Sequence, residues 1–130
     1  MPDAKKGRRI LFPEDRKVAV IDEEVAEPGD EQVLVRMKAC GICKYDIKCY
    51  LHNETNIEYS RQPGHEGVGT VEAVGCNVRD LKTGDNITSI YFGRAMADYF
   101  IADRNSVVKI PDTLVDYCLL YTSPSPRDLS

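Results

Sequence analysis

The sequence predicts a mainly β domain that folds as a closed or partly closed barrel. Short segments rich in β-branched and aromatic residues recur along the chain, and turn-forming residues separate them. One segment, residues 43–51, is the best candidate for a helix. Many short strands with almost no helix are typical of small barrels.

The first predicted elements precede residue 40. Residues 16–21 are β-rich, and a Pro-Gly turn follows at residues 27–30. Residues 31–39 alternate in polarity, which predicts a strand with one buried face. The apolar face carries Val33, Val35, Met37 and Ala39, and the polar face carries Gln32, Arg36 and Lys38.

The short helix at residues 43–51 is followed by a polar stretch, residues 53–62, that is predicted to be a loop. A glycine-containing strand is expected at residues 67–75, and a turn at residues 81–85. Three more short strands are expected at residues 86–91, 96–102 and 107–110.

The composition fits one soluble globular domain: the chain has 130 residues, of which 42% are hydrophobic and 29% charged. The net charge of -4 gives no electrostatic basis for nucleic acid binding, and no apolar run is long enough to cross a membrane. The basic start, residues 1–9, lacks an apolar signal core and is expected to be a solvated tail. Five cysteines without a signal peptide favour a reducing compartment, so we expect a cytoplasmic protein.

The last stretch differs in character from the rest. Residues 118–128 read Cys-Leu-Leu-Tyr-Thr-Ser-Pro-Ser-Pro-Arg-Asp, which matches a translated sequencing-library adapter residue for residue. A natural Ser/Pro-rich tail is the alternative. The adapter interpretation predicts that residues 118–130 are disordered and that the natural protein continues beyond Tyr117.

Metal-ligating side chains gather in two short segments. Cys43 and Asp46 lie three residues apart in the predicted helix, and His65 and Glu66 lie in a Gly-His-Glu-Gly motif where a strand begins. A thiolate and a neutral imidazole are zinc ligands, and Asp46 is placed to accept the other ring N–H of His65. Taken singly, Cys43 would be a buried small residue and His65 a core histidine, but the two patterns together favour zinc. Glu66 is either a third ligand or a group behind the ligands, and a residue elsewhere is the alternative third ligand.

Two weaker patterns involve the other cysteines. Cys40 and Cys43 have the spacing of a redox pair, and Cys49 with His52 has the spacing of a separate metal site. We expect Cys40 to pack at a strand end instead. Cys76 and His52 are expected to be structural or surface residues.

These residues resemble the zinc-dependent medium-chain alcohol and polyol dehydrogenase family. The resemblance spans residues 17–111 and rests on three segments: Gly41-Ile42-Cys43-Lys44-Tyr45-Asp46, Pro63-Gly64-His65-Glu66-Gly67-Val68-Gly69-Thr70-Val71 and Leu81-Lys82-Thr83-Gly84-Asp85. It implies a GroES-like barrel as catalytic domain, followed by a Rossmann domain that binds NAD or NADP. It also implies that Cys43 and His65 are catalytic zinc ligands, that Glu66 is a conditional ligand, and that Asp46 is the partner of His65.

The resemblance implies a function for a longer parent protein. That function is hydride transfer between a small secondary alcohol or polyol and NAD or NADP, by an enzyme that forms homo-oligomers. Residues 1–117 are then expected to be a truncated catalytic domain that is inactive alone. The alternative is a stand-alone zinc-binding or interaction module without catalysis.

The chain departs from the family pattern in three places. The third zinc ligand and the dinucleotide-binding glycine motif belong to the family's later sequence and do not occur here. The four-cysteine lobe that many members insert is missing too, since residues 86–97 contain no cysteine, so we expect no structural zinc. Finally, Tyr45 occupies a position where the family often has a Ser or Thr that relays the alcohol proton; a phenol can also donate and accept.

Overall fold

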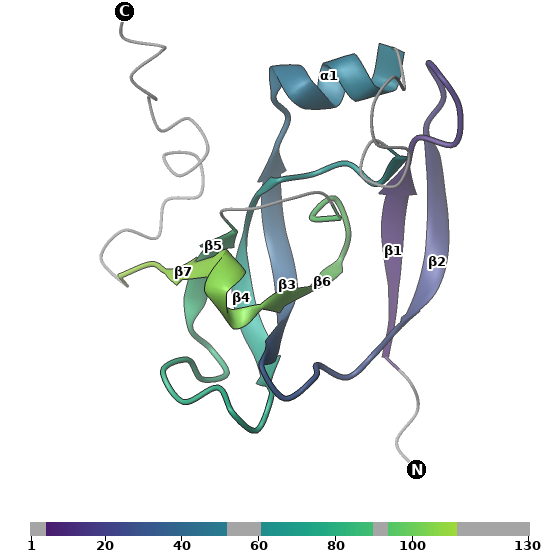
Figure 1. Ribbon diagram of the computed structural model, residues 1–130. Helices are drawn as coiled ribbons and strands as arrows, with labels where there is room; N and C mark the ends of the chain where they lie inside the picture. Colours follow the sequence, from purple (N-terminus) through teal and green to yellow (C-terminus); the bar gives the residue numbers. More distant parts are fainter. Residues whose placement is uncertain (1–4, 52–60, 90–93, 112–130) are drawn as a thin grey trace, which may run out of the picture.

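The computed structural model describes residues 5–51, 61–89 and 94–111. Within these ranges the chain forms two antiparallel sheets and one α-helix, α1, which lies across one end of the strands (Figure 1). The elements are β1 (Lys5–Leu11), β2 (Ala19–Val25), β3 (Gln32–Gly41), α1 (Lys44–Leu51), β4 (Glu66–Val74), β5 (Asn86–Ser89), β6 (Tyr99–Asp103), a 3-10 turn (Arg104–Ser106) and β7 (Val107–Lys109).

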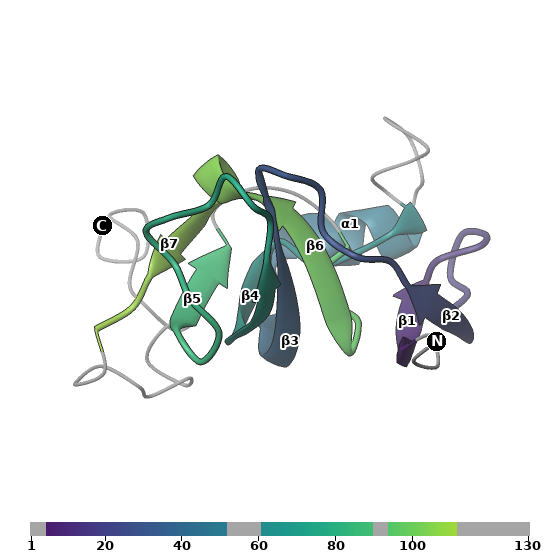
Figure 2. The ribbon, with the colours of Figure 1, turned by 90° about the horizontal axis from the view of Figure 1, so that it is seen from below.

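The main sheet has five strands in the order β6-β3-β4-β5-β7, and every neighbouring pair is antiparallel. Seen from below, these strands fan around a curve and form a half-barrel (Figure 2). Two register shifts in the pairing of β3 with β4 accompany this curvature, as bulges bend and twist a strand. The predicted mainly β, partly closed barrel is therefore confirmed.

The core of the half-barrel lies on one face of β3 and β4. Val33, Val35 and Val71 are almost completely buried and pack with Ile87 and Phe100. Burying a side chain of this size contributes about 1.5–3 kcal/mol each. The alternation in residues 31–39 correctly predicted that Val33 and Val35 are buried. Leu34, which lies between them and points to the opposite face, is buried as well.

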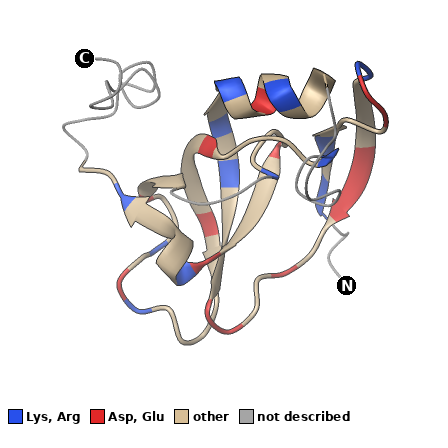
Figure 3. Ribbon diagram, turned by 45° about the horizontal axis from the view of Figure 1, so that its top comes forward, with Lys and Arg blue, Asp and Glu red and all other residues tan. Residues whose placement is uncertain are grey.

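The prediction of a solvated tail at residues 1–9 is wrong for the part that the structure describes. Residues 5–9 are not a solvated tail, because they begin β1, which pairs with β2 along its whole length. The register sets Lys6 opposite Glu24 and Arg8 opposite Asp22, so a basic strand faces an acidic one (Figure 3). β2 also starts later than predicted and extends to Val25, since its acidic residues are matched by the cations of β1.

The other predicted elements agree with the structure to within a few residues. The turn predicted at residues 27–30 forms two residues later, at 29–32, where the Gln32 N–H donates to the Gly29 carbonyl at 3.0 Å. β6 begins three residues later than predicted, and β5 is described only as far as Ser89. The predicted loop at residues 53–62 falls mostly outside the described residues, and the adapter-like tail falls wholly outside them. In the described part of the chain, no helix is long and apolar enough to cross a membrane.

Candidate metal centre

The helix α1 begins immediately after Cys43, and two side chains of the site cap it. The Cys43 carbonyl accepts the first helical hydrogen bond, from the Ile47 N–H at 3.2 Å. The Cys43 Sγ accepts the Tyr45 N–H at 3.2 Å, and Asp46 Oδ2 accepts the Cys43 N–H at 2.9 Å. This reciprocal arrangement resembles a capping box, except that the Cys43 sulfur accepts the N–H two residues on instead of three. The Cys-x-x-Asp spacing therefore both starts the helix and fixes the thiol.

A tight turn brings His65 to the same place. Gly64 adopts a φ of 108°, and a Cβ there would lie 2.4 Å from the Met96 backbone nitrogen, so the position requires glycine. The Gly64 N–H donates to Asp46 Oδ1 at 3.3 Å. The carboxylate of α1 thus holds the backbone that precedes His65.

The structure brings Cys43, Asp46 and His65 together, with ligand atoms within 4.8 Å of one another. Cys43 Sγ lies 3.0 Å from His65 Nε2, and Asp46 Oδ1 lies 3.6 Å from His65 Nδ1. The two ring nitrogens therefore address different partners. Asp46 is 3% exposed and also accepts two backbone N–H groups, so its oxygens already face His65 and the backbone of Cys43 and Gly64.

The pKa values of the three groups are shifted by these contacts and by burial. Asp46 raises the pKa of His65 above its ordinary value, and burial of the ring opposes part of that effect. Burial acts to raise the pKa of Asp46, but its contacts with His65 and the N–H groups of Cys43 and Gly64 outweigh burial and lower it. Burial raises the pKa of the Cys43 thiol. Hydrogen bonds from the backbone lower this pKa, but each by less than burial raises it. An ionised Asp46 favours a proton on Nδ1 and leaves the Nε2 lone pair facing the sulfur.

The two other predicted site residues lie beside the cluster. Glu66 begins β4 opposite Gly41 and is half-buried, and its carboxylate acts on the pKa values of Cys43 and His65. It does not belong to the group of three ligand residues found in the described chain. The Tyr45 ring lies edge-on to the His65 ring, with centroids 5.8 Å apart, and Tyr45 is 45% exposed.

The remaining cysteines stay outside the cluster. Cys40 is half-buried near the end of β3, and burial raises its pKa to about 11, which works against a redox role with Cys43. Cys49 is buried on α1, while its suggested partner His52 is outside the described residues. Cys76 is exposed.

A thiolate, an imidazole and a supporting carboxylate fit zinc by the chemistry of the donor set. Cys43 and His65 supply two potential ligand atoms 3.0 Å apart, and the Asp46 carboxylate lies behind the ring, 3.6 Å from Nδ1. The sequence indicates these three residues, but no local signal in it reveals the close approach of the Met96 backbone to Gly64. The double use of Cys43 as ligand candidate and helix cap was missed too, and the Cys-x-x-Asp pattern is the signal that could have revealed it.

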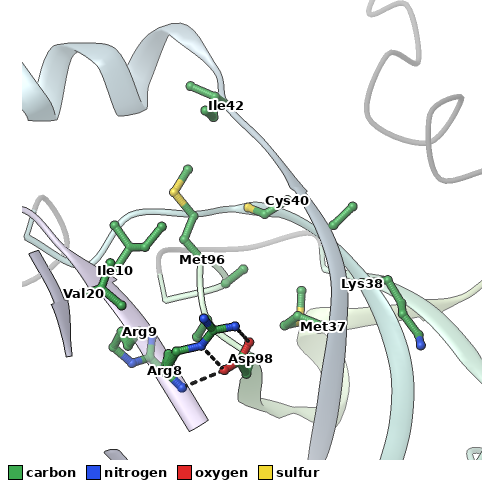
Figure 4. Close-up of a pocket in the computed structure, with 13 residues that line it drawn as sticks. Arg8, Arg9, Ile10, Val20, Met37, Lys38, Cys40, Ile42, Met96 and Asp98 are labelled. Atoms are coloured by element: carbon green, nitrogen blue, oxygen red, sulfur yellow. Dashed lines mark hydrogen bonds and ion pairs between the residues drawn. The ribbon is translucent and has the colours of Figure 1, made fainter. Parts of the chain in front are cut away.

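A separate cavity of about 450 Å³ lies between β1, β3 and residues 95–98, and the three cluster residues do not line it. Figure 4 shows the Arg8–Asp98 ion pair, with a closest distance of 3.1 Å, on one side of this cavity. Most of the lining is apolar, and two lining residues, Val20 and Ile42, are strongly exposed. No pattern in the sequence indicates this cavity.

The fold and site together define a class: a GroES-like half-barrel with a thiol–imidazole–carboxylate cluster at one end of its strands. The family described as alcohol dehydrogenase GroES-like domain matches residues 29–112, which is more than half of the chain. The chain belongs to this family.

Individual relatives give the same result. L-galactonate-5-dehydrogenase of Escherichia coli (strain K12) is 37% identical over 81 residues, covering 62% of this chain and 24% of that protein. Quinone oxidoreductase of Homo sapiens is 35% identical over 100 residues, covering 72% of this chain and 29% of that protein. The solved structure of quinone oxidoreductase from Pseudomonas syringae pv. Tomato DC3000 has a TM-score of 0.73 at 28% identity, over 85% of this chain and 35% of that one. The chain thus spans about a quarter of the length of the curated relatives it matches.

Proposed function

We propose that this chain is the zinc-binding part of an oxidoreductase that transfers hydride between a secondary alcohol or polyol and NAD or NADP. The observation that carries the proposal is the convergence of Cys43, Asp46 and His65 within 4.8 Å. Membership of the alcohol dehydrogenase GroES-like family and the likeness to L-galactonate-5-dehydrogenase support it.

In this proposal Cys43 and His65 hold the metal, and Asp46 keeps the His65 ring in the tautomer that exposes Nε2. Glu66 is the candidate for a further ligand, because it follows His65 directly and its charge acts on both ligands. When bound, zinc supplies a Lewis acid that lowers the pKa of the substrate hydroxyl. The half-exposed phenol of Tyr45 stands beside His65 and is proposed to relay the hydroxyl proton towards solvent.

The cofactor-binding part is proposed to lie in a following Rossmann domain of a cytoplasmic, homo-oligomeric parent. Residues 1–117 are then a truncated GroES-like domain, and residues 118–130 an adapter-derived tail. The short span relative to the curated relatives supports this division. So does the apolar surface beside the cluster, where Ile42 is 71% and Ile47 52% exposed and would be covered by further protein.

Metal analysis tests the site. In zinc titrations the purified chain is expected to bind one zinc, weakly because the ligand set is one short, and the Cys43→Ala and His65→Ala variants are expected not to bind it. Cys76→Ala is the matched control, because this thiol is exposed and remote from the cluster. Two zinc ions per chain, or zinc binding by both ligand variants, would refute the assignment.

Cofactor titration tests the division into domains. This chain is expected to show neither saturable NAD or NADP binding nor turnover of secondary alcohols and polyols above the Cys43→Ala variant. Micromolar cofactor binding would contradict a cofactor site in another domain.

Two alternatives make different predictions. A stand-alone zinc-binding or interaction module predicts a natural stop soon after Tyr117 in the genomic sequence, whereas the enzyme predicts a glycine-rich βαβ unit there. The human quinone oxidoreductase, which matches 72% of this chain, favours a quinone as hydride acceptor. In that case the full-length enzyme would reduce quinones, and this activity would survive Cys43→Ala.

A further inference from the structure

We infer that the aromatic ring of Tyr45 positions the His65 imidazole, a role separate from any role of the Tyr45 hydroxyl. The inference deepens the proposed function and rests on it, because a correctly oriented imidazole matters most when Nε2 holds a metal. Its evidence is the way in which the first turn of α1 surrounds His65.

Three residues at the start of α1 contact the His65 ring. Cys43 Sγ lies 3.0 Å from Nε2, and Asp46 Oδ1 lies 3.6 Å from Nδ1. The Tyr45 ring closes a third side, with centroids 5.8 Å apart and planes at 79°. This is the edge-to-face geometry that aromatic pairs prefer.

The two polar contacts leave the tilt of the imidazole poorly fixed. The outer torsion of histidine joins an sp³ to an sp² atom and has a broad energy profile, so neighbouring groups must set the ring plane. The 3.6 Å separation from Asp46 is longer than a good hydrogen bond and restrains the ring weakly. The Tyr45 ring lies across the imidazole plane and supplies the missing restraint.

The backbone of Tyr45 is held in place at the start of α1. Its N–H donates to Cys43 Sγ at 3.2 Å, which ties the residue to the cap of α1. Tyr45 is 45% exposed, and its side chain also hydrogen-bonds with the thiol of the buried Cys49. A shortened side chain therefore changes the surroundings of Cys49 as well as those of His65, so folding of each variant must be compared directly.

Two substitutions separate the ring from the hydroxyl. Tyr45→Phe keeps the ring and removes the hydroxyl, while Tyr45→Ser keeps a hydroxyl and removes the ring. Ile47→Ala is the matched control, since Ile47 is an exposed apolar residue on the same helix, 52% exposed. Circular dichroism checks that all variants fold alike.

The first readout needs no metal. The chain has two histidines, so in a His52→Gln background every imidazole proton signal in the NMR spectrum belongs to His65. Nuclear Overhauser contacts from the His65 ring protons to the side chains of Cys43 and Asp46 report the orientation of the imidazole. These contacts should persist in Tyr45→Phe and change in Tyr45→Ser. Identical contacts with and without the aromatic ring would overturn the inference, whether or not the chain binds metal.

The second readout uses Co²⁺ as a spectroscopic substitute for zinc. Tyr45→Phe and Ile47→Ala should match the wild type in visible spectrum and affinity. Tyr45→Ser should bind Co²⁺ about three- to tenfold more weakly, the range expected for one aromatic pair, with displaced ligand-field bands. A wild-type spectrum and affinity in Tyr45→Ser, or an equal loss in Tyr45→Phe, would overturn the inference. Failure of the wild type to bind Co²⁺ would refute the proposed metal function instead, and the NMR result would still decide the role of the ring.

Discussion

Replacing Asp46 by alanine should destabilise the metal-free chain strongly. The Asp46 side chain is 3% exposed and accepts the Cys43 N–H at 2.9 Å and the Gly64 N–H at 3.3 Å. Alanine removes both acceptors, and neither N–H gains a new one from the substituted side chain. The start of α1 and the backbone before His65 therefore both lose their hydrogen bond to Asp46.

The magnitude follows from these two hydrogen bonds. A hydrogen bond to a charged group contributes about 1.5–3 kcal/mol, and the longer bond to Gly64 belongs at the low end of that range. The expected loss in the free energy of unfolding is therefore about 3 kcal/mol, out of the roughly 5–15 kcal/mol that is usual for a domain. With an m-value of about 1.5 kcal/mol/M, the urea midpoint should fall by about 2 M.

Urea unfolding in the presence of EDTA measures this loss without a contribution from metal. Asp22→Ala is the matched control, because Asp22 is exposed on β2 and its removal should cost less than about 1 kcal/mol. Asp46→Asn should fall between the two, since its amide offers one acceptor oxygen instead of two. If Asp46→Ala were no less stable than Asp22→Ala, the anchoring role of Asp46 would be wrong.

Three further predictions concern the rest of the chain. Gly75→Ala should lower the free energy of unfolding by about 3 kcal/mol, because its Cβ would lie 2.0 Å from the Gly29 carbonyl oxygen. Gly29→Ala is the control, because its Cβ would meet only the movable end of a glutamine side chain. Equal stabilities of the two variants in thermal or urea unfolding would contradict this prediction. Arg8 lowers the pKa of Asp98, so the stability that this pair contributes is present above the ordinary pKa of 3.8 and is lost as the pH falls through the lowered value. Asp98→Asn should remove this part of the acid dependence in urea titrations, by less than about 1 kcal/mol because both side chains are exposed; an unchanged pH profile would count against the pair. Deleting residues 118–130 should leave the melting temperature unchanged, since a Ser/Pro-rich segment has little to pack with, and a clear fall would speak against an adapter origin.

Local patterns in the sequence were enough for most of the fold. The alternation around Val33 and Val35 predicted β3 and its buried face, because a strand exposes its side chains in turn to core and solvent. The start of α1 could also be predicted, since Cys43 and Asp46 sit within one helical turn, and the glycine before His65 indicated an unusual backbone conformation, which the structure shows as a positive φ. These features depend on neighbours within a few residues, which a sequence displays directly.

The tertiary structure decided what depends on distant partners. The basic segment 5–9 became a strand rather than a tail because β2 and Asp98 supply its counter-charges, the latter 90 residues away from Arg8. The 3.0 Å contact between Cys43 and His65 joins residues that are 22 positions apart, and the Tyr45 ring reaches His65 only because β4 returns beside α1. The sequence by itself determined which side chains are suited to hold a metal, whereas only the folded chain determined that they meet, because no local interaction fixes the path between them.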